Sequence, residues 1–118
     1  MRGISLLLIV VPTTEPIIEG YQSGTVKQPG DTVILKCSVV GGNPLPSLQW
    51  YKNDKPYHHE FRTDEQTSKV WSELLINVTR SDNNAVYRCD AVNAALTEPY
   101  SKQVKFTVKC KSLSSSVF

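Results

Sequence analysis

A chain of 118 residues is long enough for one domain with a single hydrophobic core. Its 13 basic and 11 acidic residues leave a net charge of +2. The basic residues form no run of four, so the sequence lacks the electrostatic footprint of a protein that binds nucleic acid or an anionic membrane. No stretch approaches the roughly 20 apolar residues that a membrane-spanning helix needs.

The first thirteen residues combine a basic start with a short apolar run. Arg2 precedes residues 4–11, in which Leu, Ile and Val dominate, and this order resembles a secretion signal. Residues 12–15, which follow, contain no small-residue cleavage site. We interpret residues 1–13 as a weak signal peptide or stray leader. The alternative is an apolar strand continued from a segment upstream.

Residues 31–39 are the first clear strand in the chain. Their alternation has a period of two, which predicts one face turned into the core. A Pro-Gly turn at 28–31 precedes this strand, and 41–46 predict a break because two prolines there are incompatible with a central strand. The residues expected on the inner face are Val33, Leu35, Cys37 and Val39.

The next strand covers residues 47–52. Leu48 and Trp50 are expected to be buried, with Gln49 and Tyr51 facing outward. Residues 53–56 carry turn chemistry. Residues 57–69 are polar and without a pattern, which predicts an edge strand or a loop.

Three further strands are predicted at 71–79, 85–91 and 102–109. Leu75 and Asn77 are expected to face outward from the first of them. Helical periodicity is absent throughout. The fold class is therefore all-β, a two-sheet antiparallel sandwich of about seven strands with Greek-key connections. The residues expected to point inward are Leu74, Ile76, Tyr87, Cys89, Ala91, Val104, Phe106 and Val108.

The spacing of four residues indicates which family of β-sandwich domains the chain resembles. Cys37 precedes Trp50 by thirteen positions, and Tyr87 lies two positions before Cys89. In this spacing the chain resembles the immunoglobulin superfamily over residues 14–109. The resemblance identifies a scaffold more strongly than an activity, because loops and sheet faces carry the function of such domains.

The resemblance implies one core disulfide, Cys37 to Cys89, and hence an oxidising compartment. Trp50 and Leu74 would pack in the core beside it, and Tyr87 would anchor a corner of the chain. A cross-link between positions 52 residues apart stabilises by about 4 kcal/mol in the loop-entropy description.

Two details are left open by the sequence. In the usual pattern an acidic residue lies four positions before the corner tyrosine, where this chain has Asn83 with Asp82 one position earlier, so either side chain is a candidate to close the corner. Cys110 has no predicted partner. It pairs with another chain, pairs with a further domain, or is a free thiol in a flexible tail, 110–118.

Four short segments narrow the resemblance to one group of receptors within the superfamily. Residues 16–21, 41–44, 48–53 and 82–93 are similar to an inner immunoglobulin repeat of the nephrin, hibris and sticks-and-stones type of cell adhesion receptors, and hemicentin and sidestep types use similar phrases. The resemblance implies a non-catalytic recognition or spacer module, extracellular, whose partners are other immunoglobulin-superfamily surface proteins, like or unlike. Such receptors carry many domains and a membrane span, which suggests a fragment. The alternative is a secreted single-domain immune or decoy molecule.

Two surface features are candidate sites. Asn77 begins an Asn-Val-Thr sequon and is expected on the outer face of its strand, which predicts a glycosylation site that would leave the opposite sheet the freer face. On that opposite sheet, five side chains should project together, either as a binding face or as an ordinary solvated surface. They are Gln49, Tyr51, Arg88, Asp90 and Val92.

Catalysis and metal binding find little support in the sequence. His58 and His59 are adjacent, so on an extended segment they point to opposite sides, and no Cys-x-x-Cys accompanies them. No base is positioned for a nucleophile, and no glycine-rich phosphate loop is present. We therefore expect no metal, no cofactor and no small-molecule substrate. An enzyme on a sandwich scaffold is the remote alternative.

Overall fold

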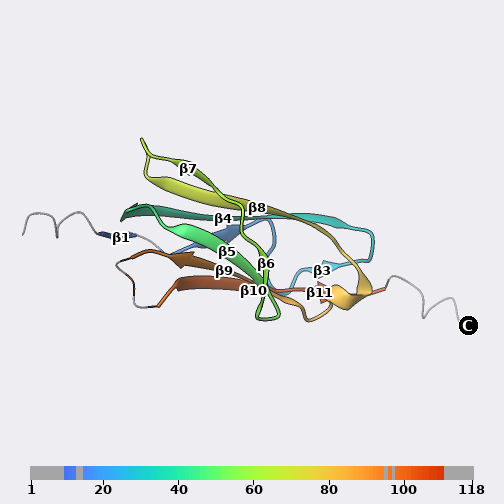
Figure 1. Cartoon of the computed structure of the whole chain (residues 1–118). Coiled ribbons are helices and arrows are strands. Elements are labelled where there is room, and N and C mark those ends of the chain that lie inside the picture. Colours follow the sequence, from blue (N-terminus) through green and yellow to red (C-terminus); the bar gives the residue numbers. More distant parts are fainter. Residues whose placement is uncertain (1–9, 13–14, 95, 97, 111–118) are drawn as a thin grey trace, which may run out of the picture.

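The computed structural model describes residues 10–12, 15–94, 96 and 98–110. In this part of the chain the structure is two antiparallel sheets packed face to face, with no α-helix and a single turn of 3₁₀-helix at Arg80–Asp82 (Figure 1). The predicted all-β sandwich is confirmed.

The first sheet is built around the longest strand, β4. Strand β8 pairs with β4 along nine positions, and β7 forms the edge beyond β8. Strands β1 and β2 pair with different stretches of β4. The strands of this sheet are β1 (Val10–Pro12), β2 (Ile17–Glu19), β4 (Thr32–Asn43), β7 (Arg62–Asp64) and β8 (Lys69–Asn77).

The second sheet has the order β10-β9-β5-β6. Strand β6 follows β5 through the tight turn of Asn53 and Asp54, so the predicted turn at 53–56 is shorter than expected and its last two residues belong to a strand. A short parallel pair, β3 with β11, lies beyond the end of this sheet. The strands are β5 (Ser47–Lys52), β6 (Lys55–His58), β9 (Val86–Val92) and β10 (Tyr100–Lys105), with β3 (Val26–Lys27) and β11 (Thr107–Val108) in the parallel pair.

The core lies between the two sheets and follows the predicted alternation. Cys37 on β4 and Cys89 on β9 form the predicted disulfide, and both are buried. Trp50 lies opposite Cys89 in the register of β5 and β9, and its indole N–H donates to Ser72 Oγ at 3.1 Å. Other buried residues that the alternation predicts are Val33, Leu35, Val39, Leu48, Leu74, Ile76, Tyr87, Ala91, Val104, Phe106 and Val108.

The predicted break at 41–46 is partly wrong. Strand β4 continues to Asn43, since Pro12 pairs with Gly41 and Val10 pairs with Asn43. Gly41 and Gly42 have φ of 93° and 103°, which only glycine adopts without strain, so the strand bends here but keeps its partner. The break itself is confined to the three residues between β4 and β5.

Strand β1 lies within the segment 1–13 that the sequence interprets as a leader. It pairs with β4, and the interpretation of residues 1–13 as a weak signal peptide or stray leader stays a prediction. Residues 1–9 and 13 lie outside the described part of the chain, as do 111–118 of the predicted tail. The domain boundaries at 14 and 109 therefore stay predictions.

The corner around Tyr87 is closed by Asp82. Tyr87 Oη donates to Asp82 Oδ1 at 2.8 Å, and Lys52 Nζ lies 3.0 Å from the same oxygen. The backbone N–H of Thr79 donates to the other carboxylate oxygen at 2.9 Å. Asn83 instead accepts a hydrogen bond from the backbone of β11 at 3.0 Å. Of the two candidates for the corner, Asp82 takes that role.

These contacts change how both groups of the corner ionise. Burial raises the pKa of the Asp82 carboxyl, but hydrogen bonds from Thr79, Lys52 and Tyr87, together with the charge of Lys52, lower it more, and the pKa lies below its ordinary value of 3.8. The pKa of the Tyr87 hydroxyl is raised, first by burial and then by its hydrogen bond to the carboxylate.

Candidate functional site

The outer face of the sheet β10-β9-β5-β6 carries the five residues singled out from the sequence. The register places Gln49 opposite Asp90 and Tyr51 opposite Arg88. Val92 lies on the same face of β9, two positions beyond Asp90. The topology therefore brings all five residues together on one face. Their contacts show which of these side chains are exposed to solvent and which are held against other residues of the domain.

Arg88 is held from three sides. Its Nη1 donates to Asp54 Oδ1 at 2.5 Å, and its Nε donates to Asp90 Oδ1 at 2.9 Å. The guanidinium carbon lies 4.4 Å from the centre of the Tyr51 ring, within cation–π range. The side chain nevertheless keeps 26% of its surface exposed. Arg88 is thus an oriented cation that still reaches solvent.

The electrostatic setting of Arg88 follows from these contacts. Burial lowers the pKa of the guanidinium, but hydrogen bonds to Asp54 and Asp90 and the charges of both carboxylates raise it above its ordinary value. One cation beside two carboxylates leaves this cluster with a formal charge of −1 at neutral pH. The face is therefore polar and close to neutral rather than basic.

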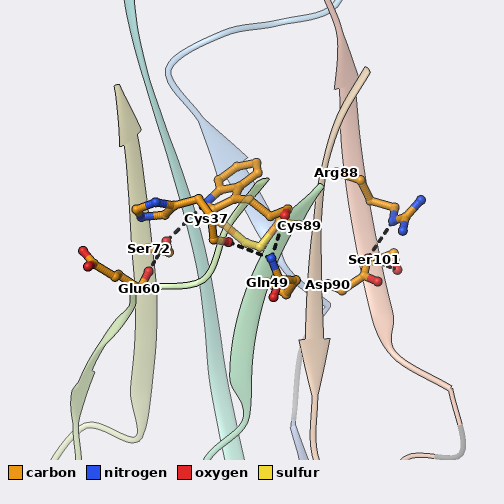
Figure 2. Close-up of a disulfide and its surroundings, with 10 residues drawn as sticks. Cys37, Gln49, Glu60, Ser72, Arg88, Cys89, Asp90 and Ser101 are labelled. Carbon is orange, nitrogen blue, oxygen red and sulfur yellow. Dashed lines mark hydrogen bonds and ion pairs between the residues drawn. A yellow bond between two sulfur atoms is a disulfide. The ribbon is translucent and has the colours of Figure 1, made fainter. Parts of the chain in front are cut away.

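The carboxylate of Asp90 is buried, whereas the sequence predicts that it projects into solvent. It lies on the predicted face, but Arg88 and the hydroxyl of Ser101, which donates to Asp90 Oδ1 at 2.7 Å, cover it. Only 6% of Asp90 is exposed. Its role is to position Arg88, and the expectation of a projecting group is corrected in this respect (Figure 2).

Gln49 is also a positioning residue. Its side-chain amide donates to the backbone carbonyls of Trp50 at 2.9 Å and of His58 at 3.0 Å. The pairing of β5 with β6 shifts register between Trp50 and Tyr51, and the amide bridges the two strands beside this irregularity (Figure 2). The Gln49 amide therefore links β5 to β6.

The groups left available form one patch. Val92 is 47% exposed, Gln103 on β10 lies opposite Arg88, and Tyr51 presents part of its ring. We call Tyr51, Arg88, Val92 and Gln103 the Arg88 face. Sequence reasoning missed Asp54, Ser101 and Gln103, because their contribution depends on a hairpin turn and on the register of β10.

An open groove of about 550 Å³ lies at the edge between β6 and β8. Ser72 lies in its lining, and its hydroxyl donates to the backbone carbonyl of Glu60 at 2.6 Å (Figure 2). No group of three or more metal-ligating side chains occurs in the described ranges, the groove included. The predicted absence of a metal stays a prediction. The groove is lined by His58, His59, Glu60, Phe61, Arg62, Trp71, Ser72 and Glu73.

The sequon residue Asn77 is the last residue of β8, on the other sheet. It is exposed, as the alternation predicts.

Cys110 is a free, exposed thiol at the end of the described chain. No helix within the described residues is long and apolar enough to cross a membrane.

Comparison with known proteins decides the family. A family profile described as "Immunoglobulin domain" matches residues 15–93. The chain belongs to the immunoglobulin domain family. The structure contains the features typical of this family, namely the Cys37–Cys89 disulfide, the buried Trp50 and the corner formed by Tyr87.

Individual relatives of this immunoglobulin domain include adhesion proteins. Human nephrin is 34% identical over 88 residues, which cover 73% of this chain and 7% of nephrin. Human cell adhesion molecule 4 is 28% identical over 108 residues, which cover 89% of this chain and 27% of that protein. The solved structure of the mouse nectin-like molecule 4 full ectodomain superposes with a TM-score of 0.68 at 25% identity, covering 85% of this chain and 35% of that one.

Two consequences follow from these comparisons. The immunoglobulin domain spans 7% and 27% of the lengths of the two curated relatives, so it corresponds to a single domain within longer proteins. Membership in a family of non-enzymatic binding domains supports a non-catalytic module. The resemblance to nephrin-type adhesion receptors expected from the sequence is confirmed.

Proposed function

We propose that this immunoglobulin domain is an extracellular recognition module of a multidomain cell adhesion receptor. The observation that carries the proposal is the similarity to nephrin and to a cell adhesion molecule, together with a buried disulfide of the kind that persists in oxidising compartments. Its partners, on this proposal, are other immunoglobulin-superfamily proteins on cell surfaces, either like or unlike this chain.

The Arg88 face is the contact surface that we propose. Tyr and Arg are enriched at protein interfaces and at their energetic hot spots. Asp54, Asp90 and the Tyr51 ring already hold the Arg88 side chain, so binding would immobilise little additional rotamer freedom. Because the two neighbouring carboxylates outweigh the charge of the single cation, the fitting partner surface is aromatic and hydrogen-bonding rather than acidic.

One such face supports only modest affinity. Tyr51, Arg88, Val92 and Gln103 lie on three adjacent strands and form a small patch. Many copies on apposed cells would raise the avidity well above the affinity of one domain, which suits an adhesion receptor. A module that only spaces other domains would need no such oriented surface.

The experiment compares two charge insertions on opposite sheets. Val92→Asp places a carboxylate on the Arg88 face, whereas Ile17→Asp, on β2, places one at a similarly exposed apolar position on the other sheet. Multimerised wild-type and variant domains are tested for binding to cells that display immunoglobulin-superfamily ectodomains. We expect Val92→Asp to weaken binding at least tenfold and Ile17→Asp to leave it unchanged.

Circular dichroism on both variants confirms that each remains folded. Equal binding by Val92→Asp and wild type would reject the Arg88 face as the contact surface. A folded, oxidised wild-type domain that binds none of the displayed ectodomains would reject recognition in favour of a spacer role.

A further inference from the structure

The outer face of the first sheet carries an apolar pair that the core does not use. Ile34 on β4 and Leu75 on β8 lie directly opposite each other, and they are 55% and 61% exposed. Directly opposed residues in antiparallel strands have Cβ atoms about 4.5–5.5 Å apart. The two side chains therefore form one continuous surface, which we call the Ile34–Leu75 patch.

The patch is bounded by polar residues along both strands. Lys36 pairs with Glu73 on one side of it, and Thr32 pairs with Asn77 on the other. A contiguous apolar surface on an exposed sheet face favours association with another apolar surface unless something covers it. The residues that border the patch indicate what that cover is.

Asn77 lies two positions from Leu75 on the same face of β8, so the two Cα atoms are about 7 Å apart. It is exposed, and it begins the Asn-Val-Thr sequon. A sugar on the Asn77 amide would start at the border of the patch. Pyranose rings carry C–H faces that pack on aliphatic side chains, while their hydroxyl groups remain in water.

We infer that an N-linked glycan on Asn77 packs over the Ile34–Leu75 patch and prevents self-association through this sheet. The inference rests on the proposed extracellular function, because the modification occurs on the secretory route. In the transfer, the Asn77 amide nitrogen bonds to the anomeric carbon of a lipid-linked oligosaccharide. The bond from that carbon to the lipid diphosphate breaks, the lipid diphosphate leaves, and the amide gives up one proton.

A tethered sugar fits the patch better than a protein partner does. Its covalent link keeps it at high effective concentration beside Leu75. A protein approaching Ile34 would have to displace the sugar from the neighbouring strand. The glycosylated sheet would thus be closed to contact, and the Arg88 face on the opposite sheet would stay open.

The test uses the full chain, expressed in mammalian cells behind a secretion leader. Intact mass reports the glycan and the oxidation state, and sedimentation velocity reports self-association. We expect the glycosylated wild type to be monomeric and Asn77→Gln to associate at least tenfold more strongly. Adding Leu75→Thr to Asn77→Gln should restore the monomer, whereas adding Ile17→Thr, an exposed apolar position farther along the same sheet, should not.

Enzymatic removal of the sugar from folded wild-type protein gives a second measurement that does not depend on folding of a variant. Self-association after this treatment supports the inference, as do nuclear Overhauser contacts between sugar protons and the Leu75 methyl groups. Secreted, oxidised protein without a glycan, or a sugar-free protein that stays monomeric, would overturn the inference and leave the proposed function intact. Reduced protein that is retained in the cell would overturn both.

Discussion

At the scale of single residues, the hairpin of β5 and β6 supplies groups to two charged clusters with different roles. Lys52 pairs with the Asp82 carboxylate, whose side chain is almost completely buried, and Asp54 pairs with Arg88, which still reaches solvent. In the first cluster the carboxylate is buried while the Lys52 side chain stays 27% exposed, and this buried charge links the cluster to stability. The second keeps an oriented cation at the surface, on the face that we propose as the contact surface.

Replacing Asp82 with Asn should destabilise the domain by about 2 kcal/mol. The substitution keeps the size of the side chain but removes the charge that Lys52 and Tyr87 share, and it leaves Lys52 without its close partner. Urea unfolding followed by tryptophan fluorescence measures the change. Glu65→Gln, which neutralises an exposed carboxylate, is the matched control and should change the free energy of unfolding by less than about 0.5 kcal/mol.

The same carboxylate predicts an acid dependence of stability. The pKa of Asp82 is lower in the folded protein than its ordinary value of 3.8. Its contribution is therefore present above about pH 4 and is lost as the pH falls through the folded pKa. Melting temperatures measured from pH 6 to pH 2 should fall at the acid end for wild type, and less steeply for Asp82→Asn. Parallel curves for the two proteins would contradict this assignment.

At the scale of elements, the tight turn of β5 and β6 sets the geometry of the Arg88 face. Asn53 and Asp54 have φ of 52° and 68°, the left-handed values that a two-residue hairpin turn of this twist needs at both positions. Asn53 Oδ1 also accepts a hydrogen bond from the backbone N–H of Val86 at 3.0 Å. The turn is thereby fixed to β9, and Asp54 is held where it meets Arg88.

Asn53→Ala should cost about 1–2 kcal/mol of stability, because alanine tolerates the left-handed conformation poorly and cannot accept the hydrogen bond from Val86. Asn53→Gly separates the two effects, since glycine adopts the conformation freely but also lacks the acceptor. We therefore expect thermal denaturation to rank wild type above Asn53→Gly and Asn53→Ala lowest. An alanine variant as stable as the glycine variant would show that backbone conformation contributes little.

The elements also show why sequence reasoning succeeds in the strands and fails between them. Alternation with a period of two is a local property, and it placed Leu35, Trp50 and Phe106 in the core correctly. The predicted break at 41–46 starts too early because the two prolines act only from residue 44 onward, while the pairing that keeps Gly41 and Asn43 in a strand comes from β1. Contacts that depend on distant register are invisible to local patterns.

The candidate site shows the same division. The sequence placed Gln49 and Asp90 on the correct face, because strand alternation determines the face. It could not show that Gln49 binds the backbone or that Ser101 covers Asp90, since both contacts involve strands whose register is set by loops. Strand alternation therefore predicts which face a side chain lies on more reliably than it predicts whether that side chain is exposed.

At the scale of the whole molecule, the two sheets present outer faces of different character. One carries the Ile34–Leu75 patch beside a sequon, and the other carries the Arg88 face. A single disulfide joins β4 of the first sheet to β9 of the second. Because both faces depend on the sandwich staying closed, this cross-link matters for the proposed contact surface as well as for folding.

Replacing Cys37 and Cys89 together with Ala should lower the free energy of unfolding by about 4 kcal/mol, because the cross-link closes a loop with a sequence separation of 52 residues and restricts the unfolded chain. That is a large part of the roughly 5–15 kcal/mol that holds a typical domain folded. Chemical denaturation under oxidising conditions measures the change. Cys110→Ser, which removes the exposed free thiol, is the matched control and should leave stability unchanged. A double variant as stable as wild type would mean that the domain does not depend on an oxidising compartment, and it would weaken the proposal of an extracellular location.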